Sequence, residues 1–178
     1  MTCDPLYWFW KSELPPAVCD AIIQEGLKLE FKQAEVGDDE KVNTGIRASK
    51  VAFFPGNSWV SAITSHYMNV ANNQAWKFAI TGQQNPQFTI YDLDEFYDFH
   101  EDQALLGDNM RKLSVVISVT DPALYTGGEF EFEDGVKPEI KERGSIIVFP
   151  SFVRHRVTPV STGTRYSLVN WFVGPQFK

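Results

Sequence analysis

Short apolar segments, each closed by a turn signal, follow one another from Trp76 almost to the end of the chain. They are five to ten residues long and rich in β-branched and aromatic residues, and clusters of Gly, Pro, Asp or Ser separate them. A regular succession of this kind is typical of a sandwich, a jelly roll or a barrel. The predicted strands are residues 76–81, 87–91, 95–100, 112–120, 129–133, 145–149, 154–159 and 164–173.

Two helices are predicted ahead of this block of strands. A Pro-Pro pair can begin a helix over residues 17–32, and residues 58–72 place apolar side chains at spacings of three and four. Apolar segments at 7–10 and 47–54 predict two further strands. The expected fold class is therefore α+β, mainly β, with the N-terminal helices packed on one sheet.

Composition and charge narrow the functional classes. The 178 residues contain no repeat and no change of composition, which predicts one domain over residues 1–178. With 16 basic and 23 acidic residues the net charge is −7, which argues against a nucleic-acid partner or an anionic membrane. No apolar run approaches the ~20 residues of a membrane span. The first residues do not resemble a signal peptide, and Cys3 and Cys19 are too few for a disulfide framework, so a cytoplasmic setting is expected.

Three histidines limit where histidine chemistry can occur. His100 and Asp102 form an HxD unit at the end of a predicted strand, where residues i and i+2 face the same side. His155 lies in another predicted strand, and two imidazoles with one carboxylate leave adjacent positions open on a non-haem Fe(II). The HxD unit alone is weak support, because short motifs recur by chance. His66 has no potential metal ligand near it in the sequence pattern and is predicted to be an ordinary helix residue.

A basic residue makes this pattern far more specific. Arg165 follows His155 by ten residues, across a predicted turn at residues 161–163. In this order of HxD, distal His and basic residue, the sequence resembles the 2-oxoglutarate- and Fe(II)-dependent oxygenases of the prolyl 4-hydroxylase type, particularly their small bacterial and phage members. The resemblance extends over residues 47–174. It also includes a tyrosine nine positions before the first histidine, a Gly-Gly-Glu turn and a Gly-Ser pair, namely Tyr91, Gly127, Gly128, Glu129, Gly144 and Ser145.

The resemblance implies a fold and a set of roles. The fold would be a double-stranded β-helix, a cupin-like jelly roll with its core at residues 47–174 and the metal between its two sheets. The catalytic residues and Fe(II) ligands would be His100, Asp102 and His155. The residues that bind the cosubstrate 2-oxoglutarate would be Arg165, Tyr91, Ser167 and Ser114. The planar guanidinium of Arg165 can form two parallel bonds to a carboxylate, although many eukaryotic members have Lys at this position.

The same resemblance implies an activity. The protein would use O2 and 2-oxoglutarate to hydroxylate a peptidyl side chain, with proline C4 as the expected position, and would release succinate and CO2. Ascorbate would serve as an auxiliary reductant, and the setting would be a bacterial cell or a phage-infected host. Two alternatives stay open: the same chemistry on a small molecule or nucleobase, and a non-catalytic jelly-roll module that retains a metal.

The substrate is expected to be a peptide or protein that contains proline. The segments expected to select it are residues 35–49, which begin with an acidic exposed loop at 35–44, and residues 103–111. Within them, Arg47 and Arg111 are candidates for binding a carbonyl group of the peptide or an acidic residue next to the modified one.

Overall fold

The computed structural model describes residues 5–34 and 45–177, in which strands form a larger and a smaller antiparallel sheet. The predicted loop at 35–44 and Cys3 lie outside the described residues. The strands of the larger sheet are β1 (Trp8–Trp10), β2 (Lys32–Gln33), β4 (Lys50–Phe53), β5 (Gly82–Gln83), β6 (Gln87–Tyr91), β8 (Leu105–Leu106), β9 (Asn109–Ser118), β12 (Ile146–Pro150) and β15 (Arg165–Pro175). Their order is β1-β12-β9-β15-β6-β4-β2, with β5 paired to β15 and β8 paired to β9.

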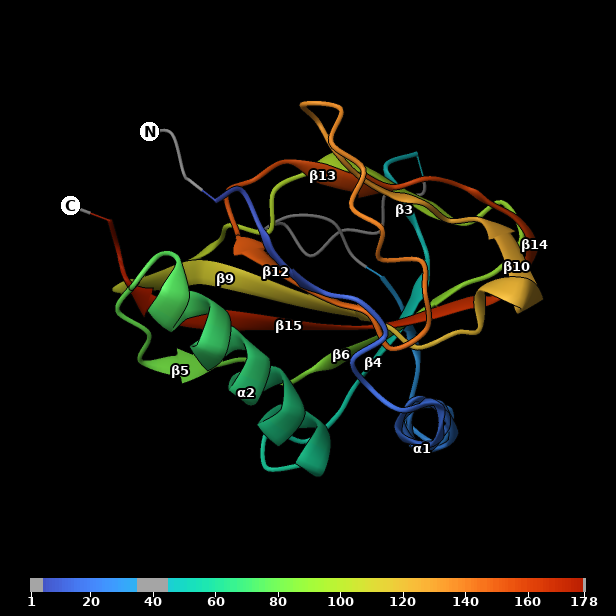
Figure 1. Cartoon of the computed structure of the whole chain (residues 1–178), viewed down its shortest axis with the longest axis horizontal. Helices are drawn as coiled ribbons and strands as arrows, with labels where there is room; N and C mark the ends of the chain where they lie inside the picture. The colour runs from blue at the N-terminus through green and yellow to red at the C-terminus, as the bar shows by residue number, and fades with distance from the viewer. Residues whose placement is uncertain (1–4, 35–44, 178) are drawn as a thin grey trace.

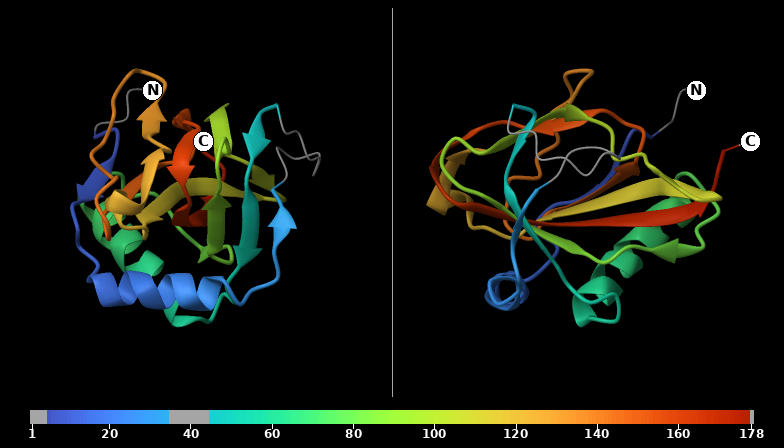
Figure 2. Two further views of the ribbon diagram at one scale, coloured as in Figure 1. Left: turned by 90° about the vertical axis from the view of Figure 1, so that its right-hand side faces the viewer. Right: turned by 180° about the vertical axis from the view of Figure 1, so that it is seen from behind.

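The smaller sheet lies across the larger one, as Figures 1 and 2 show. Its strands are β3 (Arg47–Ala48), β7 (Phe96–His100), β11 (Phe130–Phe132) and β13 (His155–Val157), in the order β11-β13-β7-β3. A separate pair, β10 (Tyr125–Gly127) and β14 (Val160–Gly163), closes one end. A single 3-10 turn, η1 (Pro122–Leu124), precedes β10.

Both described helices pack on the outer face of the larger sheet (Figure 1). They are α1 (Pro16–Gly26) and α2 (Trp59–Gln74), and Ser58 caps α2 by accepting a hydrogen bond from the amide of Ser61. This arrangement confirms the α+β prediction with helices on one sheet. Neither described helix combines the length and apolarity that crossing a bilayer would require.

The larger sheet has an apolar core on each of its faces. One core lies between this sheet and the helices, and the other lies between the two sheets. Along β9, Leu113, Val115 and Ile117 pack with the helices, whereas Val116 points into the space between the sheets. The inter-sheet core is aromatic, with Phe130, Phe132, Phe149 and Tyr91 among its buried members. Because both faces are buried, the sequences of these strands are continuously apolar and do not alternate between apolar and polar residues.

Seven of the eight strands predicted after Trp76 are confirmed, and β6 coincides with the predicted residues 87–91. The predicted strand at 76–81 is wrong. The side chain of Asn72 holds these residues in a turn, because it accepts from the amide of Phe78 at 2.8 Å and donates to the Phe78 carbonyl at 2.9 Å. Lys77, inside this turn, has a φ of 54°, which is incompatible with a strand.

The first helix is shorter than predicted. It ends at Gly26 rather than at Lys32, and Lys32 pairs instead with Val51 in the larger sheet. Gly26 packs directly on the ring of Phe88, where an added Cβ would lie 2.7 Å from the nearest ring atom. The helix therefore ends where it meets the sheet, which helical periodicity alone does not reveal.

Gly144 connects the N-terminal segment to the strands. It has a φ of +79°, its carbonyl accepts from the amides of Glu13 and Leu14 at 3.0 and 3.1 Å, and a Cβ there would overlap the Leu14 carbonyl. Gly144→Ala should therefore lower the free energy of unfolding by about 2–4 kcal/mol, through left-handed strain and overlap together. Gly107→Ala is the matched control, because Gly107 also has a positive φ but no atom within 4 Å of its Cβ position. That change should cost only about 1 kcal/mol in urea unfolding, and equal losses would contradict this account.

Candidate functional site

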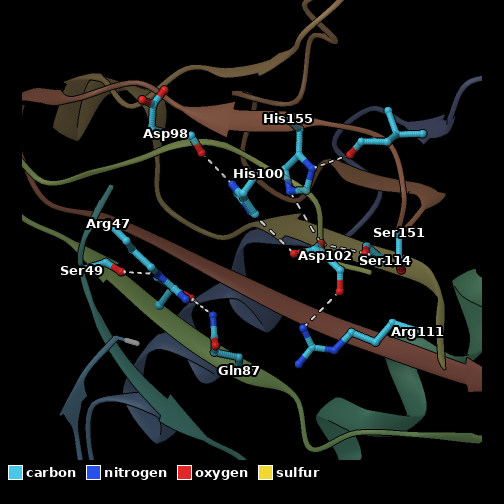
Figure 3. Close-up of polar contacts among 12 residues, drawn as sticks. Arg47, Ser49, Gln87, Asp98, His100, Asp102, Arg111, Ser114, Ser151 and His155 are labelled. Carbon is cyan, nitrogen blue, oxygen red and sulfur yellow. Dashed lines mark hydrogen bonds and ion pairs between the residues drawn. The ribbon is translucent and has the colours of Figure 1, made fainter. Parts of the chain in front are cut away.

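Three potential metal ligands meet between the two sheets. His100 ends β7 and His155 begins β13, and the two residues are opposite each other in the antiparallel register. Asp102 follows β7, with Oδ1 3.6 Å from Nε2 of His100 and Oδ2 3.6 Å from Nε2 of His155 (Figure 3). One ligand atom from each residue lies within 4.8 Å of the others. Two imidazoles and one carboxylate at this spacing could hold a single metal ion on one face.

Backbone carbonyls orient both imidazoles. Nδ1 of His100 lies 2.7 Å from the carbonyl oxygen of Asp98, and Nδ1 of His155 lies 2.9 Å from that of Val153. Because a carbonyl only accepts hydrogen bonds, each Nδ1 carries the ring proton and each Nε2 directs a lone pair toward the centre. Contacts of this kind fix the tautomer and ring position of metal-binding histidines.

The protonation states of the buried ligands also suit a metal. Burial, together with the nearby His100, lowers the pKa of His155 to about 4, so its imidazole is neutral at pH 7. Burial alone would raise the pKa of Asp102, but its contacts with His155, His100 and Ser114 outweigh burial and keep the pKa below the usual range. A neutral imidazole and an ionised carboxylate are the forms that bind divalent metals.

Aromatic rings enclose the two histidines. The ring of Tyr97 is stacked on His100 with centroids 3.3 Å apart, and Phe130 is stacked on His155 at 5.2 Å. Phe149 meets His155 edge-on at 4.7 Å. These contacts restrict the orientations that both imidazoles can take.

A pocket extends from the three ligands to a buried arginine. Arg165 is only 2% exposed, and its guanidinium donates to Oγ of Ser167 at 3.2 Å and lies 5.4 Å from the ring centroid of Tyr91. The pairing of β15 with β6 places Arg165 directly opposite Tyr91. In the described part of the chain, no Asp or Glu lies within ion-pair distance of Arg165. A buried guanidinium without a carboxylate partner is costly, so the pocket is suited to an anionic ligand.

Two further residues of the pocket, Gln87 and Tyr97, were not singled out from the sequence. Trp171 also lines the pocket, and so does Arg47, which the sequence indicated as a candidate for contact with the substrate. Nε of Arg47 donates to Oγ of Ser49 at 3.0 Å, and its guanidinium lies 4.5 Å from the ring centroid of Tyr97. A signal for Gln87 was available, because it is four residues before Tyr91 on the same strand and therefore faces the same side.

Ser114 lies beside the carboxylate of Asp102. It is absent from the pocket lining, and its hydroxyl donates to Oδ2 of Asp102 at 2.7 Å (Figure 3). Its oxygen is also 3.0 Å from Oγ of Ser151, a residue that the sequence did not indicate. The structure therefore brings Ser114 to Asp102, a candidate metal ligand, and leaves it outside the lining of the pocket.

This geometry agrees with the comparison to known families. Residues 86–173 match the family model of the 2OG-Fe(II) oxygenase superfamily, and this range contains His100, Asp102, His155 and Arg165. Residues 86–173 form a domain of this superfamily. The resemblance seen in the sequence is thereby confirmed for the oxygenase domain.

Among curated proteins, the chain is similar to a PKHD-type hydroxylase of Gloeothece citriformis. The two are 36% identical over 88 residues, which cover 47% of this chain and 40% of the relative. The match thus spans about two fifths of the length of that relative.

Solved structures extend the likeness to nearly the whole chain. A Pseudomonas putida prolyl-4-hydroxylase has a TM-score of 0.73 at 22% identity and covers 97% of this chain and 94% of its own. A Trichoplax adhaerens prolyl hydroxylase, solved with a peptide fragment of the hypoxia inducible factor oxygen degradation domain, has a TM-score of 0.77 at 18% identity. It covers 95% of this chain and 84% of its own. At these identities the likeness concerns the fold, and it confirms the predicted double-stranded β-helix.

Proposed function

We propose that the protein is an Fe(II)- and 2-oxoglutarate-dependent dioxygenase that hydroxylates a peptidyl side chain, with proline C4 as the position of attack. The observation that carries this proposal is one pocket lined both by the His-Asp-His set and by a buried arginine that has no carboxylate partner among the described residues. The first feature suits a metal and the second suits a dicarboxylate that reaches away from it.

The residues of the oxygenase domain would have two roles, metal binding and cosubstrate binding. His100, Asp102 and His155 would hold Fe(II), which with 2-oxoglutarate and O2 supplies the oxidation of an unactivated C–H bond and releases succinate and CO2. Arg165 and Ser167 would bind the distal carboxylate of 2-oxoglutarate, and the hydroxyl of Tyr91 would add a hydrogen bond. Burial raises the pKa of Tyr91, so its phenol stays protonated and can donate.

A groove beside the pocket supports a peptide substrate. It shares Arg47, Gln87, Tyr97, Asp102 and Trp171 with the pocket, so a bound chain would reach the metal ligands. Its further lining combines amide side chains with exposed apolar ones, namely Gln83, Gln84, Asn85, Gln103, Phe53, Leu105 and Leu106. Amide groups can hydrogen-bond to the backbone of an extended peptide, and the apolar groups can contact a pyrrolidine ring. Both structural neighbours are prolyl hydroxylases, which agrees with this substrate class.

A turnover assay with a mixed peptide library tests the proposal. The protein would be incubated with Fe(II), 2-oxoglutarate and ascorbate, and products would be read by mass spectrometry. Proline-containing peptides should gain one oxygen atom, yield 4-hydroxyproline on hydrolysis and release succinate in equal amount. His155→Ala serves as the control and should give neither product.

Two other outcomes would replace the proposal. Oxidation confined to free amino acids or nucleosides in parallel mixtures would favour a small-molecule or nucleobase oxygenase. A metal-loaded protein that releases no succinate from any mixture would favour a non-catalytic module. Ascorbate as reductant and a cytoplasmic setting belong to the proposal as well, and the buried free thiol of Cys19 agrees with a reducing compartment.

A further inference from the structure

Two buried serines lie behind the carboxylate of Asp102, on the side away from the pocket. Ser114 comes from β9 and Ser151 follows β12, and neither side chain is exposed to solvent. The pairing of these strands sets Ser114 opposite Phe149 and so brings Ser151 next to it. Ser114 donates to Oδ2 of Asp102 at 2.7 Å, and the two serine oxygens are 3.0 Å apart.

The direction of these hydrogen bonds follows from the number of protons. A serine hydroxyl has one proton, and that of Ser114 is used toward Asp102. Ser151 must therefore be the donor in the bond between the serines, which gives the order Ser151 to Ser114 to Asp102. Ser151 also holds Asp102 through the main chain, because its carbonyl accepts from the amide of Asp102 at 2.9 Å.

The two carboxylate oxygens of Asp102 are consequently not equivalent. Oδ2 accepts the hydrogen bond from Ser114, whereas the hydrogen bonds of the described residues include none from a hydroxyl or an amide to Oδ1. Each oxygen lies 3.6 Å from an imidazole Nε2, Oδ1 from that of His100 and Oδ2 from that of His155, but Oδ2 shares its lone pairs with Ser114 while Oδ1 keeps its own for a metal. A carboxylate held by one oxygen in this way is restrained from turning both oxygens toward the ion.

We propose that Ser151 and Ser114 form a positioning relay that limits Asp102 to one coordinating oxygen and so keeps a coordination position open for the cosubstrate or O2. The inference rests on the metal-site part of the proposed function. It gives Ser114 a role different from cosubstrate binding. It also assigns a role to Ser151, a residue that the sequence did not indicate.

Co(II) titration of the purified chain, followed by its visible d–d absorption, tests the relay without requiring turnover. Ser114→Ala should weaken Co(II) binding about 10–100-fold, the usual effect of losing a partner of a metal ligand, and should change the shape of the d–d bands. Ser114→Thr keeps the hydroxyl and should bind close to wild type. Ser118→Ala is the matched control, because Ser118 lies on the same strand, is 2% exposed and has a hydroxyl without a hydrogen-bond partner in the structure.

A double-mutant cycle separates a relay from simple packing. Ser151→Ala alone should weaken Co(II) binding several-fold, but it should add nothing when Ser114 is already alanine, because its hydroxyl acts through Ser114. Independent, additive effects of the two changes would overturn the relay. So would wild-type affinity and unchanged bands in Ser114→Ala, or, should that variant fail to fold, wild-type affinity in Ser151→Ala. A wild-type chain that binds no Co(II) would instead contradict the metal site and the relay together.

Discussion

Replacing either His100 or His155 by alanine should remove the bound iron. Each imidazole would supply one of only three protein ligands, and the two that remain cannot hold Fe(II) against dilution and gel filtration. The iron content should fall from about one ion per chain to about a tenth of that or less, the loss expected when one ligand of a facial triad is missing. Elemental analysis of protein reconstituted with Fe(II), or with Mn(II) as an inert substitute, gives the answer directly.

His66 offers a matched control for this experiment. It lies on α2, where its ring meets that of Tyr67 edge-on at 5.1 Å, and it does not belong to the metal-ligand group. His66→Ala should therefore keep the full metal content. If all three histidine variants retained iron equally, the assignment of the metal site would be wrong. Asp102→Ala should abolish turnover as well, and added formate or halide could restore part of it by entering the vacated position.

The strand block was predictable because most of its signals are local. Apolar runs bounded by Gly, Pro or Asp clusters predicted seven strands correctly, and the Gly-Gly-Glu signal lies where β10 ends, with Gly127 and Gly128 both at positive φ. The errors arose where distant contacts compete with local preference. Residues 76–81 have strand-like composition, but the side chain of Asn72 accepts a hydrogen bond from the amide of Phe78 and holds the chain in a turn. Helix α1 ends earlier than predicted because Gly26 packs against the ring of Phe88.

The candidate site was predictable only in part, for a related reason. The HxD unit, the distal His155 and Arg165 have a fixed order and spacing, and the structure brings all of them to one pocket. Tyr97 and Ser151 reach the same region through strand pairing, which no local pattern encodes. The extent of the domain over residues 1–178 remains a prediction from the sequence.

Arg165→Ala should raise the dissociation constant for 2-oxoglutarate by at least two orders of magnitude while leaving the metal content near that of wild type. Arg165 is buried and has no carboxylate partner in the described part of the chain, so the cosubstrate would supply the missing charge. Removing one partner of such a buried pair costs roughly 3–5 kcal/mol, because the other charge is left unpaired. Titration of the charge-transfer absorbance of the Fe(II) and 2-oxoglutarate complex under nitrogen measures the change.

Arg165→Lys and Arg165→Met distinguish charge from geometry and binding from folding. The lysine variant should recover part of the affinity, because it restores the charge but not the two parallel hydrogen bonds. The methionine variant should lose affinity like alanine, yet without ligand it should melt no earlier than wild type, because a buried charge without a partner does not stabilise the fold. An arginine that served only the fold would give the reverse result, with a lower melting temperature and unchanged 2-oxoglutarate affinity. In that case the pocket would not be a cosubstrate site, and a non-catalytic metal-binding module would become the better account of this chain.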